Sequence, residues 1–220
     1  MQCIYLSFLH IRLLTLNQNK QKLSHFPIMC FLAMLKKLLG ESAFKLAGWN
    51  YHIEPNVLEK KQVIVGFEHT SMRDAVLSLA LFQIMDMKIH LLIKKELFKG
   101  PMKPLLKRLG GIAVDRNANQ DIVSVMVQHF QENDQFNLVI APEATRAKTG
   151  ETRRPIRTGF WHIAKAAGVP IVLLYANSST KQGGILGKIY PTEINHDLAL
   201  LKKLYKDKVD LDIVIPDIKN

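Results

Sequence analysis

The chain reads Gln-Val-Ile-Val-Gly-Phe-Glu-His-Thr-Ser-Met-Arg-Asp from residue 62 to residue 74. The apolar, β-branched run that ends at Phe67 predicts a buried strand, and the hydroxyl residues after it can cap a helix that begins at once. His69 therefore follows a strand end, and Asp74 falls in the first turn of the helix. An imidazole can accept a proton while a carboxylate holds its other nitrogen. The two side chains are thus a candidate base and its orienting partner.

Apolar runs alternate with helical patterns along the rest of the chain. We expect further strands over six short segments: residues 89–93, 111–115, 136–141, 169–175, 188–194 and 211–215. We expect helices over five longer ones: residues 74–87, 96–109 with a break at Gly100 and Pro101, 121–131, 158–167 and 197–205. This order predicts an α/β fold, a single domain with a mostly parallel central sheet flanked by helices and with N-terminal amphipathic helices.

Three groups of polar residues follow predicted strands. They are His69, then Arg116, then Glu143, Thr145 and Arg146. Ligands of parallel sheets bind outside the carboxyl ends of the strands, so we expect all three groups at one sheet edge. An isolated H-x4-D pattern would be explained as well by a surface histidine beside a helix-capping acid, and basic loops are usually solvated. The convergence on one edge favours a site, and arginine forks there suit phosphate.

The pattern also limits the chemistry. The sequence has no G-x-S-x-G nucleophile elbow and no P-loop, and its eight histidines show no zinc spacing. We therefore expect no metal and no cofactor. What remains is a histidine base that deprotonates a substrate hydroxyl, which then attacks an activated acyl group without an enzyme nucleophile.

These motifs resemble those of the glycerolipid acyltransferase family, which includes lysophosphatidate (1-acylglycerol-3-phosphate) acyltransferases. The H-x4-D motif is residues 69–74, the G-x-x-x-x-R block is similar to residues 111–116, and the E-G-T-R block to residues 143–146. A proline between apolar residues, the fourth motif, resembles Pro170 and its neighbours. The motifs occur in the family's order, and the resemblance covers roughly residues 44–205.

The resemblance implies that His69 is the base and Asp74 its partner. It implies that four residues bind the phosphate of the acceptor: Arg116, Glu143, Thr145 and Arg146. It also implies an acyl-CoA or acyl-carrier-protein donor. Two positions depart from the family, because Glu68 stands where many members have Asn and Ala144 replaces the usual Gly. Both bear on the acceptor more than on the reaction.

The function expected from these observations is acyl transfer in phospholipid biosynthesis, from the thioester donor to the free hydroxyl of a lysophospholipid, giving phosphatidate from 1-acylglycerol-3-phosphate. One alternative is acylation of another lysolipid or of a lipid amine by the same chemistry. Another is a non-catalytic basic module that binds membranes or nucleic acid. No basic patch is interleaved with base-stacking aromatic residues, so we expect no nucleic-acid partner.

The composition suits an anionic partner, which can be phospholipid headgroups, a phosphorylated substrate or nucleic acid. Lys plus Arg is 30 against 19 for Asp plus Glu, a formal charge of +11, which predicts an anionic partner. No apolar stretch approaches the about 18 residues that a spanning helix needs. Residues 31–46 predict one or two Leu- and Lys-rich helices, interrupted near Gly40, that either lie on a membrane or pack on the domain. We expect a peripheral protein on the cytoplasmic face of an anionic membrane surface.

Domain organisation follows from the same pattern. Residues 29–220 form the expected acyltransferase domain, a length that suits one core. Residues 1–28 carry no motif, and we expect either a tail outside the fold or an extension before a natural start at Met29 or Met34.

Overall fold

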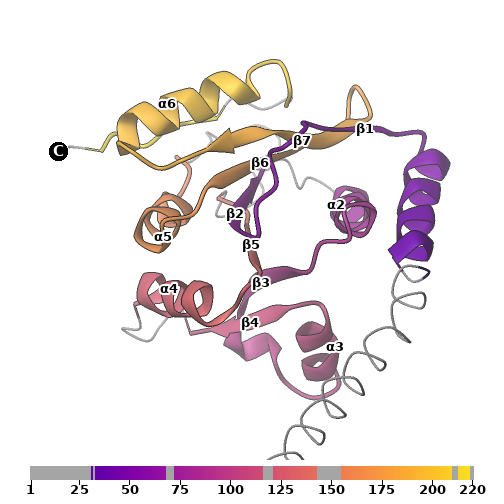
Figure 1. Ribbon diagram of the computed structural model, residues 1–220, viewed down its shortest axis with the longest axis horizontal. Coiled ribbons are helices and arrows are strands. Elements are labelled where there is room, and N and C mark those ends of the chain that lie inside the picture. The colour runs from indigo at the N-terminus through magenta and orange to yellow at the C-terminus, as the bar shows by residue number, and fades with distance from the viewer. Residues whose placement is uncertain are drawn as a thin grey trace, which may run out of the picture.

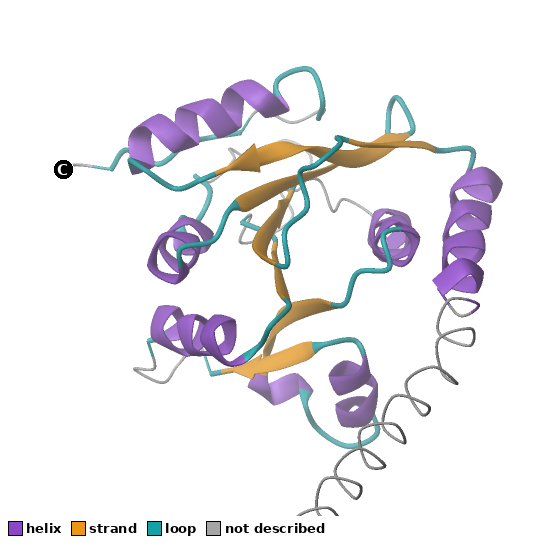
Figure 2. Ribbon diagram, viewed as in Figure 1, coloured by secondary structure: helices purple, strands orange, loops and turns teal. Residues whose placement is uncertain are grey.

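Seven strands form one sheet in this computed structural model, which describes residues 31, 33–67, 72–115, 121–142, 155–209 and 213–218. The strands are β1 (Asn50–Ile53), β2 (Lys61–Gly66), β3 (Ile89–Lys94), β4 (Gly111–Val114), β5 (Phe136–Ile140), β6 (Ile171–Asn177) and β7 (Gln182–Ile189). Their order across the sheet is β1-β7-β6-β2-β5-β3-β4 (Figures 1 and 2). Five strands, β2 to β6, run parallel to their neighbours in this set, while β7 is antiparallel to β6 and β1 runs with β7. The mostly parallel α/β sheet expected from the sequence is confirmed.

Helices cover both faces of the sheet (Figure 2). They are α2 (Met72–Ile84), the 3-10 turn η1 (Lys95–Leu97), α3 (Met102–Arg108), α4 (Ile122–Glu132), α5 (Gly159–Ala167) and α6 (Ile194–Tyr205). A further helix over residues 33–47 precedes β1. Figure 1 shows α4, α5 and α6 on one side of the sheet, with α2, α3 and the helix over residues 33–47 on the other.

Strand residues alternate between two cores, as the two-residue period of a strand requires. Val63 and Val65 of β2 face the core under α4, α5 and α6, whereas Ile64 between them faces the core under α2. All three are completely buried. Burial on both faces explains why residues 63–67 are an unbroken apolar run rather than an alternating one.

Local signals set several helix ends. Asp121 caps α4, its carboxylate accepting from the backbone N–H of Val123 at 3.0 Å. Gly168 ends α5 with φ of 66°, a left-handed conformation in which a glycine has no Cβ penalty. The helix predicted over residues 96–109 is indeed broken before Met102, into η1 and α3.

Other expectations were wrong. The strand predicted over residues 188–194 lies earlier, as β7, and β1 was not predicted. Residues 213–215 of the predicted last strand are not in a strand. The helix over residues 33–47 continues through Gly40, which is buried where it crosses α2. A side chain at Gly40 would lie 2.7 Å from Ile84 Cγ1, so this glycine permits close packing instead of breaking the helix.

Candidate functional site

The carboxyl ends of β2, β5, β3 and β4 lie next to one another at one edge of the sheet (Figure 1). Val65 is paired with Ile140. The pairing of β5 with β3, continued by one residue, places Leu92 beside Ile140, and the pairing of β3 with β4 places Ile112 beside Leu92. These four residues form a row across the sheet. The row is a common level from which the distance of each predicted site residue can be counted along the chain.

The predicted site residues follow this row at nearly equal distances in sequence. His69 comes four residues after Val65, and Arg116 comes four residues after Ile112. Glu143 comes three residues after Ile140. β5 is next to β2, and β4 is three strands away from β2. Because adjacent strands are about 4.8 Å apart, β4 is about 14 Å from β2. The chain therefore leaves the sheet at one edge directly before each motif.

Most of the predicted site residues lie just outside the residues that the structure describes. His69 and four others lie outside them: Arg116, Glu143, Thr145 and Arg146. The backbone of Asp74 is the third residue of α2, in the first turn as expected, while its side chain is outside the description. The roles predicted for these residues therefore stay predictions, and the described residues around them supply the geometry.

Tyr205 of α6 is hydrogen-bonded to the end of β2. Its hydroxyl donates to the carbonyl oxygens of Val65 at 2.9 Å and Leu174 at 2.8 Å, which share the one proton. Its ring packs edge-on against Phe67, with centroids 4.6 Å apart. Burial raises the pKa of the Tyr205 hydroxyl well above its usual value, so the group stays a neutral donor at physiological pH. The last described residues before His69 are thus tied to α6 and β6.

Two backbone hydrogen bonds close the base of the loop that carries Glu143, Thr145 and Arg146. The Arg157 N–H donates to the Pro142 carbonyl at 3.0 Å, and the Ile156 N–H donates to the Val214 carbonyl at 2.9 Å. Ile156 is buried in the core under α5. The described residues on either side of the three motif residues, Pro142 before them and residues 156–157 after them, are therefore held in place, and the segment after α6 helps to hold Ile156.

A charged contact lies beside the strand end that precedes Arg116. Lys95 Nζ is 4.0 Å from Asp115 Oδ2, across the ends of β3 and β4. The Lys95 side chain is 69% exposed, so the pair contributes little to stability. Its significance is positional, because it joins η1 to the residue directly before a predicted phosphate ligand.

Sequence reasoning did not identify Tyr205 or the segment after it. The signal was present for Tyr205, because Leu198, Leu201 and Tyr205 follow the i, i+3, i+7 spacing of one buried helix face. No sequence signal marks Val214, whose contribution is a backbone carbonyl.

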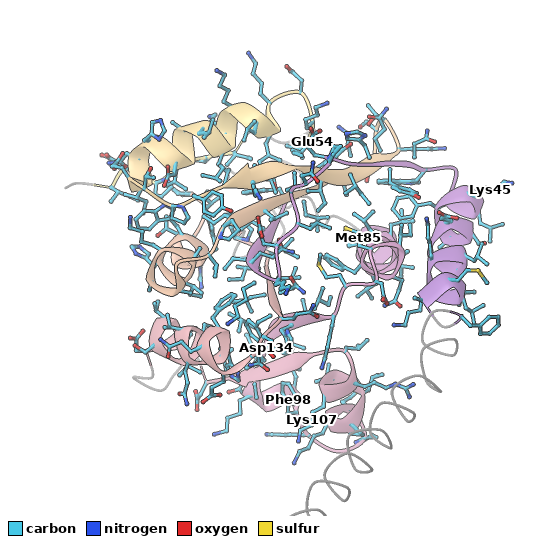
Figure 3. All side chains as sticks on the ribbon, in the orientation of Figure 1. Lys45, Glu54, Met85, Phe98, Lys107 and Asp134 are labelled. Atoms are coloured by element: carbon cyan, nitrogen blue, oxygen red, sulfur yellow. The ribbon has the colours of Figure 1, made fainter. Side chains whose placement is uncertain are left out.

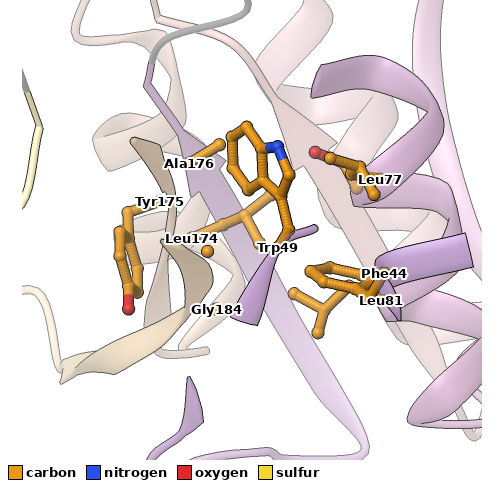
Figure 4. A pocket seen from close by; sticks show the side chains of 10 residues that line it. Phe44, Trp49, Leu77, Leu81, Leu174, Tyr175, Ala176 and Gly184 are labelled. Carbon is orange, nitrogen blue, oxygen red and sulfur yellow. The ribbon is translucent and has the colours of Figure 1, made fainter. Parts of the chain in front are cut away.

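An apolar gap lies on the opposite face of the sheet from Tyr205, between the helix over residues 33–47, α2 and the strands β6 and β7 (Figure 4). Its volume is about 10 Å³, and Phe44, Trp49 and Leu81 are among its lining residues. A space of that size holds one water molecule at most. It is a packing gap, too small in this structure for a ligand.

Across the described residues, no three His, Cys, Asp or Glu side chains are arranged to hold a metal ion. Among the helices of this described part, none is both long and apolar enough to cross a bilayer.

Comparison with known proteins links these observations to one family. The model of the Acyltransferase family matches residues 48–175, more than half of the chain. Two 1-acyl-sn-glycerol-3-phosphate acyltransferases, from Salmonella typhimurium and Salmonella typhi, are each 28% identical to it over 98 residues. These matches cover 43% of this chain and only 37% of each relative.

The fold has a counterpart among solved structures. The crystal structure of the 1-acyl-sn-glycerophosphate (LPA) acyltransferase PlsC from Thermotoga maritima superposes with a TM-score of 0.55. The match covers 81% of this chain and 77% of that one, at 16% sequence identity. At that identity the likeness concerns the fold alone.

Proposed function

Because this chain belongs to the Acyltransferase family, we propose that it transfers a fatty acyl group from a thioester donor to the free hydroxyl of a lysophospholipid. The acceptor proposed is 1-acylglycerol-3-phosphate, with phosphatidate as the product. The observation that carries the proposal is the row of strand ends, from which His69, Arg116 and Glu143 follow three or four residues later in the chain.

In the proposed reaction His69 removes the proton of the acceptor hydroxyl, and the oxygen attacks the carbonyl carbon of the thioester. The carbon–sulfur bond then breaks, and the histidine returns the proton to the departing thiolate. Asp74 holds the second ring nitrogen and stabilises the imidazolium that forms between the two steps. The position of Asp74 in the first turn of α2 suits this role, because the helix fixes the backbone of Asp74 relative to the end of β2.

The acceptor phosphate is assigned to the other motif residues. Arg116 follows β4, which lies beyond β5 and β3, and Arg146 follows β5, the strand beside β2, so both cations would approach from the same side of the base. A lysophosphatidate presents its hydroxyl and its phosphate at separate points, which suits a base and a phosphate site on different strands. The donor, acyl-CoA or acyl-carrier-protein, would meet the same edge.

A second acceptor is supported by two sequence positions. Glu68 places a carboxylate next to the proposed base, and Ala144 stands where glycine would permit closest backbone approach to phosphate. Another lysolipid or a lipid amine would need less phosphate contact. The reaction and the base would be unchanged.

The base is tested with His69→Ala in the full chain. A positioned general base contributes about 10²–10⁴-fold, and turnover should fall by that factor with an unchanged melting temperature. His162→Ala is the matched control, because His162 is an exposed histidine of α5 and its loss should leave the rate unchanged. A folded His69→Ala variant with near-normal turnover would rule out this mechanism. The non-catalytic alternative predicts no turnover in either protein.

The acceptor is tested with Arg146→Ala and a panel of lysolipids, each offered with acyl-CoA and with acyl-carrier-protein and followed by product mass. If Arg146 binds the acceptor phosphate, its loss should raise the KM for lysophosphatidate and leave the donor KM nearly unchanged. Lysine should restore binding only in part, because an ammonium cannot reproduce the bidentate fork. Arg157→Ala, at the base of the same loop, is the control for general charge. A rise in the donor KM alone would assign Arg146 to the donor and favour the second acceptor.

The membrane setting is part of the proposal. The helix over residues 33–47 packs on α2 through Phe44, which is buried, while Met34, Leu38 and Leu39 are exposed on it. Packing on the domain and lying on a membrane are therefore compatible for this helix, since one face packs on α2 and another is exposed. With the net charge of +11, this supports a peripheral protein on the cytoplasmic face of an anionic membrane.

A further inference from the structure

A second exposed apolar surface lies away from the helix over residues 33–47, on η1 and α3. We call it the α3 patch, and its apolar members are Leu97, Met102, Leu105 and Leu109, each between 41% and 56% exposed. Soluble surfaces carry scattered single apolar side chains, but neighbouring ones on one element call for a partner. Figure 3 shows this segment, with Phe98 and Lys107 labelled, at the outer edge of the molecule.

The patch is one face of a helix that is fixed to the domain on its other side. Met102, Leu105 and Leu109 follow an i, i+3, i+7 spacing, which places them on one stripe. α3 has no buried residue, and Leu106 is only partly covered. The helix is nevertheless close to the sheet, since a side chain at Gly111 would lie 2.8 Å from the Leu106 carbonyl oxygen. The apolar stripe is therefore held outward by a tight backbone contact on the inner side.

The same segment is strongly basic. Residues 94–108 contain six cations and a single acidic residue, Glu96. Among the residues that the structure describes, Lys99, Lys103 and Lys107 have no ion-pair partner, and Lys95 alone of the six is paired, with Asp115. Exposed leucines flanked by unpaired lysines match the chemistry of an anionic bilayer, whose headgroups take the ammonium groups while the apolar side chains enter the interface.

We propose that the α3 patch docks on the surface of an anionic phospholipid bilayer. The place of the patch in the fold connects it with the site. η1 begins directly after β3 ends, at the edge from which the predicted site residues follow, and Lys95 contacts the residue before Arg116. A bilayer at the patch would therefore meet the protein beside the proposed acceptor site. The proposal rests on the proposed function only in taking the acceptor to be a membrane lipid.

A bilayer fits better than the two other occupants, an acidic protein such as a carrier protein and a second copy of this chain. A partner helix is usually received in a groove between elements, whereas this stripe runs along a single short helix and the turn before it. A second copy would bring the same positive charge against the lysines, and like charges in contact oppose association. An anionic bilayer fits both the exposed apolar stripe and the positive charge.

The test measures binding of the full chain to vesicles of phosphatidylcholine with phosphatidylserine, and to vesicles of phosphatidylcholine alone. The first variant carries Lys99→Glu, Lys103→Glu and Lys107→Glu. Each lysine near an anionic surface strengthens binding about fivefold, so this variant should bind mixed vesicles at least about 100-fold more weakly. The second variant, Met102→Ser with Leu105→Ser, keeps the charge and should lose about tenfold.

The control variant carries Lys203→Glu, Lys206→Glu and Lys208→Glu. These lysines are exposed in and after α6, on the opposite side of the sheet, and the change in net charge is the same. It should bind far more tightly than the first variant. Raising the salt from about 0.1 M to about 1 M shortens the screening length from about 10 Å to about 3 Å and should release the wild-type chain. All substituted side chains are exposed, and melting temperatures check that each variant folds.

Each outcome is decisive. Equal binding by both patch variants and the wild type overturns the proposal, as does equal loss in the control variant, which would assign binding to net charge alone. If vesicle binding is unchanged and the patch variants lose transfer from acyl-carrier-protein but not from acyl-CoA, the occupant is an acidic protein. If they change only the oligomeric state, it is a second copy. Patch-dependent binding in a chain that acylates no lysolipid would support this proposal while refuting the proposed function.

Discussion

Replacing Tyr205 with phenylalanine removes one oxygen atom and tests how the end of β2 is held. In the structure that oxygen donates to the carbonyl oxygens of Val65 and Leu174, and the aromatic ring packs against Phe67. Phenylalanine keeps the ring contact and leaves both carbonyl groups without this donor. The substitution therefore separates the hydrogen bond from the packing.

The magnitude follows from burial. A buried hydrogen bond between neutral groups contributes about 1 kcal/mol net, and leaving an acceptor buried without a partner costs about 1–3 kcal/mol. Tyr205 is only 1% exposed, so water cannot replace the lost donor. We expect the free energy of unfolding of Tyr205→Phe to fall by about 1–3 kcal/mol. Tyr190→Phe is the control, since Tyr190 is 54% exposed and its loss should change stability by less than about 0.5 kcal/mol.

A positioning role predicts an effect on turnover as well. His69 comes four residues after Val65 and two after Phe67, so a shift of the strand end displaces the proposed base. Misplacement by about 1 Å can cost about 100-fold in rate, and we expect kcat to fall by about tenfold with little change in KM. Urea unfolding and steady-state acyl transfer measure the two effects. Unchanged stability would refute the hydrogen-bond argument, while lower stability with an unchanged kcat would limit Tyr205 to a structural role.

Three further perturbations test other parts of the structure. Gly40→Ala should lower the free energy of unfolding by about 1–2 kcal/mol, because its Cβ would lie 2.7 Å from Ile84 Cγ1, whereas Gly159→Ala, where nothing lies within 4 Å, should not. Deleting residues 213–220 should raise the acceptor KM with kcat less affected, since the Val214 carbonyl fixes the loop base. Burial by itself raises the pKa of the Asp197 carboxyl, but hydrogen bonds, the largest from Trp161 Nε1, lower this pKa overall from its ordinary value of 3.8. The stabilisation that ionised Asp197 gives the folded state is therefore fully present above pH 3.8. It is lost as the pH falls through the lower pKa of the folded state. Asp197→Asn should therefore flatten the acid limb of a melting-temperature profile, and an unaltered limb would exclude this carboxylate as its source.

The parts of the fold that the sequence predicted are those with local causes. β2 and β5 are apolar runs buried on both faces, and composition alone distinguishes such strands from loops. The start of α4 after Asp121 and the end of α5 at Gly168 are likewise decided within one turn of the chain. Because parallel strands end at one edge, the common edge of the strands that precede the motifs also followed from these local predictions.

The failures have a common cause in distant contacts. β7 is rich in glycine, which is a poor strand former, and its strand state depends on β6 beside it and on β1 on its other side. Gly184 shows why glycine is there, because its Cβ would lie 1.7 Å from the His52 carbonyl oxygen of β1. A pairing between residues 50–53 and 182–185 has no local signal. The apolar residues 213–215 resembled a strand, yet they lie against the loop base without joining the sheet.

The motif residues lie in one part of the chain, and two residues that support the neighbouring backbone, Tyr205 and Val214, lie in another. The region matched by the family model ends at residue 175 and contains every predicted site residue. Tyr205 and Val214 lie beyond it, and they fix the end of β2 and the base of the loop after β5. Motif residues are recognisable because the chemistry restricts each side chain, whereas a support of this kind needs only one buried hydroxyl or one carbonyl in the right place. Different sequences can supply such supports, so a fragment limited to residues 48–175 would keep every motif and lose two contacts, one at the end of β2 and one at Ile156.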